Sequence, residues 1–225
     1  MVKSQRDVFW KAAILTVVVF TAGLLMGFSF EKGRIFEIEE DYNKMRLRQI
    51  DANLQTLYYN SMIAQDSRFC EIAIDENIKF ADELYAEGTK IEQYLKANKI
   101  TEDLMINQKE YILFKTQFWL NAVALKRRCY ADYVNVVYFY KQQPENFNVD
   151  TDQNVMSGIL FEIKQEYGPD IMLIPLAVDL NISTIDIAVS QYNITKYPAL
   201  LINEEKVMQG LYNKEEITEE IEKFL

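Results

Sequence analysis

The chain has 225 residues, of which 49% are apolar, and it carries a formal net charge of −10 at pH 7. That length is enough for one compact domain with an appendage, and the acidic balance excludes a nucleic-acid partner, which would need a clustered basic face. Because the chain has no histidine, it lacks the commonest general base near neutral pH and the commonest zinc ligand, so we expect no catalytic metal and no cofactor.

The first element is an uncharged run over residues 12–30, AAILTVVVFTAGLLMGFSF. Its length approaches the roughly 20 residues that a helix needs to cross a bilayer, and Phe9 and Trp10 precede it as interfacial anchors. A cleaved signal peptide is the alternative, although its apolar region is shorter and ends at small residues. We expect a short tail over residues 1–11 and a retained transmembrane helix over 12–30, which makes the lipid bilayer the first expected partner.

Helix-forming residues dominate the next part of the chain, and residues 35–131 contain no proline and one glycine, Gly88. We expect a helical stalk and an antiparallel helical hairpin over residues 31–131, with breaks near residues 66–67 and at 98–101. Apolar stripes with spacings of three, four or seven residues give the helices a coiled-coil character. The stripes comprise Leu47, Ile50, Leu54 and Leu57, then Phe80, Leu84, Ile91 and Leu95, then Met105, Ile112 and Trp119.

The two cysteines, Cys70 and Cys129, lie at equal distances from the expected break at residues 98–101. An antiparallel hairpin with equal arms brings both to its open end, where a disulfide can join them. A disulfide of this kind indicates an oxidising compartment, so we expect a cytoplasmic N-terminus and an extracytoplasmic C-terminal domain. Two buried thiols on apolar helix faces are the alternative.

After Tyr130 the pattern changes to short extended runs that alternate with helices. Strands are expected at residues 134–140, 171–178, 199–202 and 206–211, and helices at 150–167, 184–192 and 214–225. Residues 132–225 should therefore form an α/β domain with the order β-α-β-α-β-β-α and a mixed four-stranded sheet. Proline cannot donate to a strand ladder, so the strand that contains Pro175 should lie at an edge.

Two segments of this domain resemble the thioredoxin-like fold family. LFEIKQEYG, at residues 160–168, is similar to the helix that follows the family's redox motif, and YNITKYPALLINEEKVMQGL, at 192–211, is similar to its helix, proline and hairpin. The resemblance covers about residues 134–225 and implies that Pro198 is the family's cis-proline. Counting back from the helix, it also implies that the CxxC positions are vacated and held by Asp150, Thr151, Asp152 and Gln153.

Thiol–disulfide exchange needs an attacking thiolate and a resolving thiol. Asp150 and Asp152 supply neither, and we interpret them as caps at a helix N-terminus, where carboxylates satisfy free N–H groups. The resemblance implies that peptide binds at Tyr197 and Pro198 through main-chain pairing. Tyr197 as an aromatic that covers the edge of the sheet is the alternative.

The leading hypothesis is a single-pass membrane-anchored, redox-inactive thioredoxin-like protein without a catalytic residue, which binds a protein or peptide partner outside the cytoplasm. A thiol–disulfide oxidoreductase that uses Cys70 and Cys129 is the first alternative. The second is a structural membrane protein whose helical stripes self-associate into a homo-oligomer.

Overall fold

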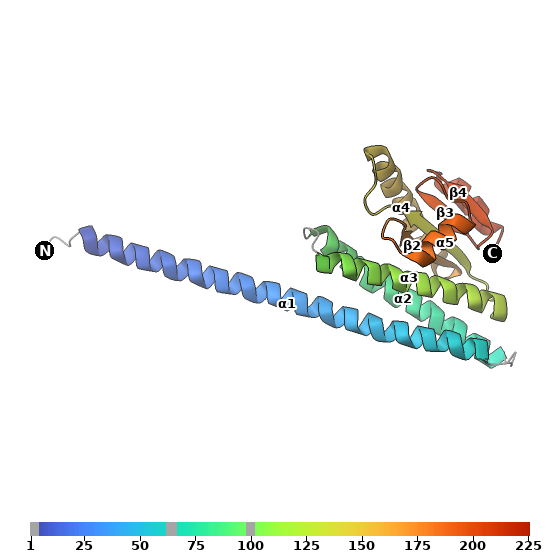
Figure 1. Ribbon diagram of the computed structural model, residues 1–225, viewed down its shortest axis with the longest axis horizontal. Helices are drawn as coiled ribbons and strands as arrows, with labels where there is room; N and C mark the ends of the chain where they lie inside the picture. Colours follow the sequence, from blue (N-terminus) through green and yellow to red (C-terminus); the bar gives the residue numbers. More distant parts are fainter. Residues whose placement is uncertain (1–4, 62–66, 98–101) are drawn as a thin grey trace. The chain divides into compact units, whose positions relative to one another are not determined.

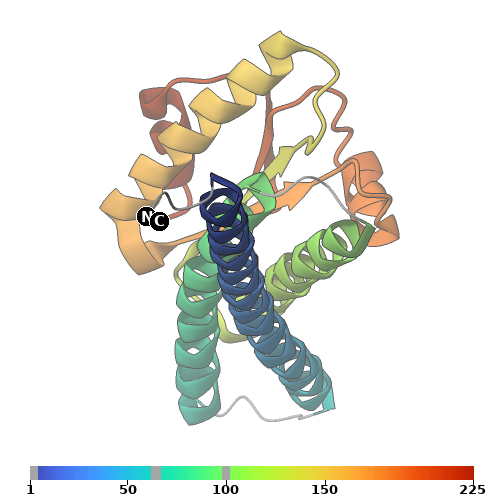
Figure 2. The same cartoon turned by 90° about the vertical axis from the view of Figure 1, so that its left-hand side faces the viewer.

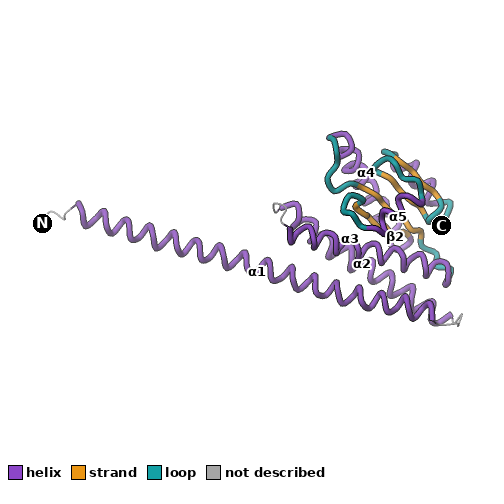
Figure 3. Tube along the Cα trace, viewed as in Figure 1, coloured by secondary structure: helices purple, strands orange, loops and turns teal. Residues whose placement is uncertain are grey.

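The computed structural model describes residues 5–61, 67–97 and 102–225. It divides into two compact units, Met1–Arg46 and Leu47–Leu225. In the described chain, the elements up to Cys129 are all helices, and the strands come after it, together with further helices (Figure 3). The predicted breaks lie outside the described residues, apart from Ser67, with which the second helix begins.

The first helix, α1 (Gln5–Ser61), runs through the first unit into the second. Its segment Phe9–Phe28 has a mean hydropathy of 2.0, and none of its side chains is buried. By length and composition this segment can cross a membrane, and a signal sequence has the same features.

The hairpin consists of α2 (Ser67–Ala97) and α3 (Glu102–Cys129), which pack against one another. The rings of Phe80 and Phe118 meet edge to face, with centroids 5.9 Å apart. Gly88 lies against the buried Tyr111, and a Cβ atom at Gly88 would stand 1.4 Å from the phenol oxygen. A glycine is therefore required for this close approach of the two helices.

The strands of the second unit form one sheet in the order β2-β1-β3-β4, in which β1 and β2 are parallel and the other pairs antiparallel. This is the mixed four-stranded sheet that the sequence predicts, and β2, which contains Pro175, lies at its edge as expected. The strands are β1 (Val134–Tyr140), β2 (Ile171–Ala177), β3 (Ala199–Ile202) and β4 (Lys206–Gln209). The remaining elements are α4 (Phe147–Tyr167), the 3₁₀ turn η1 (Gly168–Asp170), α5 (Ser183–Gln191) and α6 (Lys214–Glu222).

Side chains on β1 alternate between the two faces of the sheet, as strand geometry requires. Val136 and Tyr138 join a buried cluster with Leu160 of α4 and Ile217 of α6. On the opposite face Phe139 meets Trp119 of α3, with ring centroids 6.2 Å apart. The sheet is thus covered by α4 and α6 on one face and by α3 on the other (Figures 1 and 2).

The turn between β3 and β4 is hydrogen-bonded to α3. Asn203 and Glu204 have φ of 52° and 59°, the left-handed values of a type I′ turn, within a three-residue loop between the paired residues Ile202 and Lys206. A carboxylate oxygen of Glu204 accepts a hydrogen bond from the indole N–H of Trp119 at 2.7 Å, and the amide of Asn135 donates to both oxygens at 3.3 and 3.2 Å. Burial raises the pKa of Glu204, and these hydrogen bonds oppose that shift.

Candidate functional site

The predicted binding residues lie where β1 ends and β3 begins. These strands are antiparallel, with Phe139 paired to Ala199, so the start of β3 adjoins the carboxyl end of β1. The Tyr197–Pro198 peptide bond immediately before β3 is cis, as the resemblance implied. Pro198 is buried and Tyr197 is half-buried. The structure thus places both residues outside the carboxyl ends of the two parallel strands, where α/β sheets commonly bind ligands.

The backbone of Tyr197 is open. If the β1–β3 register continued for two more residues, Tyr197 would stand opposite Lys141. Within the described ranges, however, neither the N–H nor the C=O of Tyr197 makes a hydrogen bond, whereas the next carbonyl, that of Pro198, accepts one from Gly210 at 2.8 Å. One donor and one acceptor of an extended backbone therefore remain available to a peptide.

Gln153 of α4 explains why Lys141 does not pair with Tyr197. Its side-chain oxygen accepts the backbone N–H of Lys141 at 2.7 Å, and its amide nitrogen donates to the backbone C=O of Lys141 at 3.1 Å. Gln153 is only 6% exposed, and its own carbonyl accepts a hydrogen bond from the hydroxyl of Tyr138 at 2.9 Å. Because one buried amide satisfies both backbone groups of Lys141, those of Tyr197 are left unpaired.

A second glutamine fixes the backbone on the N-terminal side of Tyr197. The side-chain oxygen of Gln209 on β4 accepts the N–H groups of Thr195 and Lys196 at 2.7 and 3.0 Å, and its amide nitrogen donates to the carbonyl of Asn193 at 3.1 Å. These bonds fix the segment that leads into Tyr197. The open backbone edge is thus held in place before any ligand arrives, which reduces the entropy lost on binding.

The surroundings of Tyr197 carry both signs of charge. The ammonium of Lys141 lies 5.4 Å from the centroid of the Tyr197 ring, within cation–π range. Asp179 accepts the backbone N–H groups of residues 142 and 143 at 2.8 Å each, which fixes the loop after β1. Burial raises the pKa of Tyr197, Lys141 opposes the shift, and Asp179 and Asp186 add to it. The phenol is therefore neutral around pH 7 and can both donate and accept.

The four vacated positions begin within the first turn of α4 and not at its N-cap. Helix α4 begins at Phe147, three residues before the predicted start, and the side chain of Asn146 caps it by accepting the N–H of Val149 at 3.0 Å. The structure corrects the interpretation of Asp150 and Asp152 as the helix caps: the cap is Asn146, while Asp150 lies in the first turn, where a carboxylate interacts favourably with the helix dipole. Thr151 bonds within the helix, to the carbonyl of Phe147 at 2.9 Å, and among the contacts of the described residues it is Gln153 that reaches the site.

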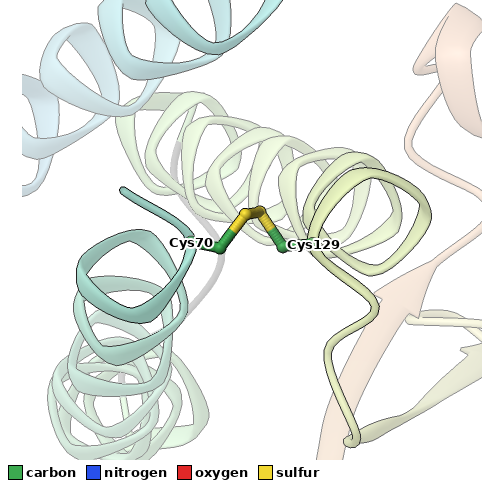
Figure 4. Close-up of a disulfide and its surroundings, with 2 residues drawn as sticks. All are labelled: Cys70 and Cys129. Carbon is green, nitrogen blue, oxygen red and sulfur yellow. A yellow bond between two sulfur atoms is a disulfide. The ribbon is translucent and has the colours of Figure 1, made fainter. Parts of the chain in front are cut away.

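A disulfide joins Cys70 of α2 to Cys129 of α3, as the sequence predicted (Figure 4). The two Cα atoms are 5.3 Å apart, and 59 positions separate the residues along the chain. Since the chain has two cysteines in all, no free thiol is left for the site at Tyr197. The bond closes the open end of the hairpin.

Sequence reasoning missed the residues that shape the site, namely Lys141, Asp179 and Gln209. Lys141 is the first residue after β1, and Asp179 follows the end of β2 by two positions. Polar residues directly after buried strands were the available signal, because the carboxyl ends of parallel strands meet at one edge. No comparable signal marks Gln209, which lies within a strand.

A cavity of about 290 Å³ lies elsewhere, beside the edge strand β2. Residues of α2, α3, α4 and β2 line it together with Tyr138 of β1, and the rings of Tyr85 and Phe161 stack beside it with centroids 6.5 Å apart. None of the predicted site residues lines this cavity. The helices around it lie beside the edge strand β2. Covering an edge strand with helices is one way proteins keep it from pairing with other chains.

No known protein-family model and no curated protein matches this chain. Among solved structures, it is similar to a thioredoxin of Fasciola hepatica, with 17% identity and a TM-score of 0.34, over 46% of this chain and 94% of that one. It is also similar to thioredoxin O2 of Arabidopsis thaliana in the oxidised state, with 16% identity and a TM-score of 0.34, over 48% of this chain and 87% of that one. A malarial protein matches with 16% identity and a TM-score of 0.33, over 41% of this chain and 98% of that one.

Proposed function

We propose that this chain is a membrane-anchored, redox-inactive thioredoxin-like protein that binds an extended segment of a protein partner outside the cytoplasm. The observation that carries the proposal is the open backbone of Tyr197 beside a buried proline, with the opposing backbone of Lys141 already satisfied by Gln153. An extended peptide that pairs with this edge gains main-chain hydrogen bonds, and the half-buried tyrosine ring adds selectivity.

Binding without redox chemistry is supported by what occupies the start of α4. Thiol exchange needs a thiolate there, and a helix N-terminus normally lowers its pKa. In this chain Asn146 and Phe147 take that place, and Phe147 is 80% exposed. The cysteine pair lies instead on α2 and α3, where it closes the hairpin.

An assay of dithiol turnover separates this proposal from the oxidoreductase alternative. The full chain in detergent micelles should catalyse neither the reduction nor the oxidation of a model disulfide substrate above the uncatalysed rate. The Cys70→Ser variant should give the same baseline. Turnover by the wild-type chain that disappears in Cys70→Ser would establish the enzyme and end the non-catalytic interpretation.

Membrane anchoring through residues 12–30 is supported by the length, apolar composition and exposure of the segment Phe9–Phe28. The proposed orientation places the N-terminus in the cytoplasm and the disulfide in an oxidising compartment. Protease treatment of sealed membrane vesicles tests both features. In vesicles whose cytoplasmic side faces inward, the protease should digest the C-terminal domain and leave the anchor in the membrane. A C-terminal domain that is found in the soluble fraction would point to a cleaved signal sequence.

Crosslinking in native membranes tests the groove itself. Tyr197→Ala removes the ring from the binding edge, and Tyr192→Ala, which alters a half-buried tyrosine just after α5, is the matched control. The yield of partner crosslinked to Tyr197→Ala should fall several-fold, and the yield with Tyr192→Ala should equal that of the wild type. Equal yields from all three chains would count against this groove.

A further inference from the structure

Four large aliphatic side chains on α1 lie exposed along one face of the helix. We refer to them as the α1 seam: Leu47, Ile50, Leu54 and Leu57, which are 69, 57, 59 and 66% exposed. The adjoining Tyr58 contacts Phe69 of α2, with ring centroids 6.2 Å apart, but the seam itself stays uncovered. It begins well beyond the apolar segment that ends at Phe28, so contact with lipid does not account for its exposure.

The spacing of the seam identifies the geometry of what can cover it. Intervals of three, four and three residues place its members at alternating a and d positions of a heptad, with Leu47 at a and Ile50 at d. A continuous apolar face of this kind marks an interaction surface. Knobs at a and d fit into the holes of another helix that crosses at a small angle, so the complementary partner is a helix lying alongside α1.

The charges that flank the seam match a second copy of the same helix. In a parallel, in-register coiled coil, the residue at g faces the residue at e of the partner, five positions further on. Arg46 occupies g and Asp51 occupies e, so the two copies would form this oppositely charged pair twice. The sequence repeats the match in the two preceding heptads, with Glu39 and Lys44, and with Lys32 and Glu37.

We propose that a second copy of this chain covers the α1 seam in a parallel, in-register coiled coil. The polar residues Glu40 and Asn43 hold the preceding a and d positions, so the aliphatic contact begins at Leu47 and ends at Leu57. The coiled coil is short, and its flanking charges fix the parallel register. Pairing brings two copies of the peptide-binding domain onto one stem, so a partner with two binding segments would be held by both.

Cysteine substitution along α1 tests the pairing in membranes that contain the full chain. Leu54→Cys places a thiol at an a position, next to the same residue of the other copy, and Gln55→Cys places one at the neighbouring b position, which faces away. Under mild oxidation, Leu54→Cys should form a disulfide-linked homodimer at least about tenfold faster than Gln55→Cys. Equal rates, or a crosslink from position 54 to a different protein, would overturn the proposal.

A charge swap tests the register independently. Arg46→Glu and Asp51→Lys each place like charges at the g–e contact and should reduce the dimer fraction of the full chain in detergent micelles. The double variant restores opposite charges and should recover the wild-type fraction. A double variant no better than the single ones, with helix content unchanged by circular dichroism, would contradict the parallel arrangement. Neither outcome depends on whether peptide binds at Tyr197.

Discussion

Replacing Gln153 by leucine should both destabilise the domain and close its binding edge. The substitution removes two hydrogen bonds to the backbone of Lys141, at 2.7 and 3.1 Å, and places an apolar side chain of similar size at a position that is 6% exposed. At about 1 kcal/mol of net stability for each hydrogen bond, the free energy of unfolding should fall by about 2 kcal/mol. The released N–H and C=O groups of Lys141 can then pair with Tyr197 and compete with peptide.

Two measurements separate these effects. Urea unfolding of the full chain in detergent micelles, followed by the fluorescence of Trp119 against the sheet, gives the loss of stability. Hydrogen exchange at the amide of Lys141 reports the loss of its side-chain acceptor. The matched control is Thr151→Ala, two residues earlier on the same helix, which loses a single bond within α4 and should leave the protection of Lys141 unchanged.

The yield of partner crosslinking should fall by about tenfold in Gln153→Leu, since about 1.4 kcal/mol of competing backbone pairing corresponds to that factor. An unaltered unfolding midpoint with an amide at Lys141 that stays protected would refute the argument that Gln153 holds the edge open. A loss of stability without any loss of crosslinking would show that Gln153 supports the fold and has no part in binding.

Removing the disulfide with Cys70→Ala and Cys129→Ala should lower the free energy of unfolding by about 4 kcal/mol on the loop-entropy model, given the 59-residue separation; hydrogen exchange should rise first in α2 and α3, and an unchanged exchange pattern would show that the bond is not formed in the membrane. Gly88→Ala improves helix propensity by up to about 1 kcal/mol, but its Cβ would overlap the hydroxyl of Tyr111, so we expect a net loss of about 1–3 kcal/mol in denaturant titrations; a more stable variant would mean that the hairpin is packed differently. The pKa of the Glu204 carboxyl is raised in the folded state, so the folded chain binds a proton at Glu204 more tightly than the unfolded chain does. The protonation of Glu204 therefore stabilises the fold at low pH, and this stabilisation is lost as pH rises from the ordinary pKa of 4.5 through the raised value. Glu204→Gln should flatten that part of the curve of unfolding free energy against pH, and parallel curves for the two chains would refute the assignment.

The sequence was most informative where burial alone decides the structure. The apolar, β-branched run from Val134 to Tyr140 is buried on both faces of a central strand, and β1 has those bounds. Pro175 located the sheet edge because of a missing donor, which is a property of the residue itself. The equal spacing of Cys70 and Cys129 about a break sufficed to predict the disulfide, since a hairpin has one simple geometry.

The sequence was least informative where a side chain serves a distant backbone. The start of α4 was missed because its cap, Asn146, lies in a polar run with several possible caps. Gln153 was noticed only as a vacated position, and its contact with Lys141 depends on how α4 lies over the end of β1. The link from Glu204 to Trp119 joins residues 85 positions apart, which no local pattern specifies.

The proposed function depends on an extended peptide segment binding to the backbone edge at Tyr197. The most direct test replaces Tyr197 with the photoreactive residue benzoylphenylalanine in the full chain, irradiates native membranes, and sequences the attached peptide by mass spectrometry; the same replacement at Tyr192 is the control. We predict that position 197 captures a recurrent extended segment of a partner outside the cytoplasm and that position 192 does not. Capture of the same species in equal yield at both positions, or only of lipid and solvent adducts at 197, would show that this edge is not a peptide-binding site.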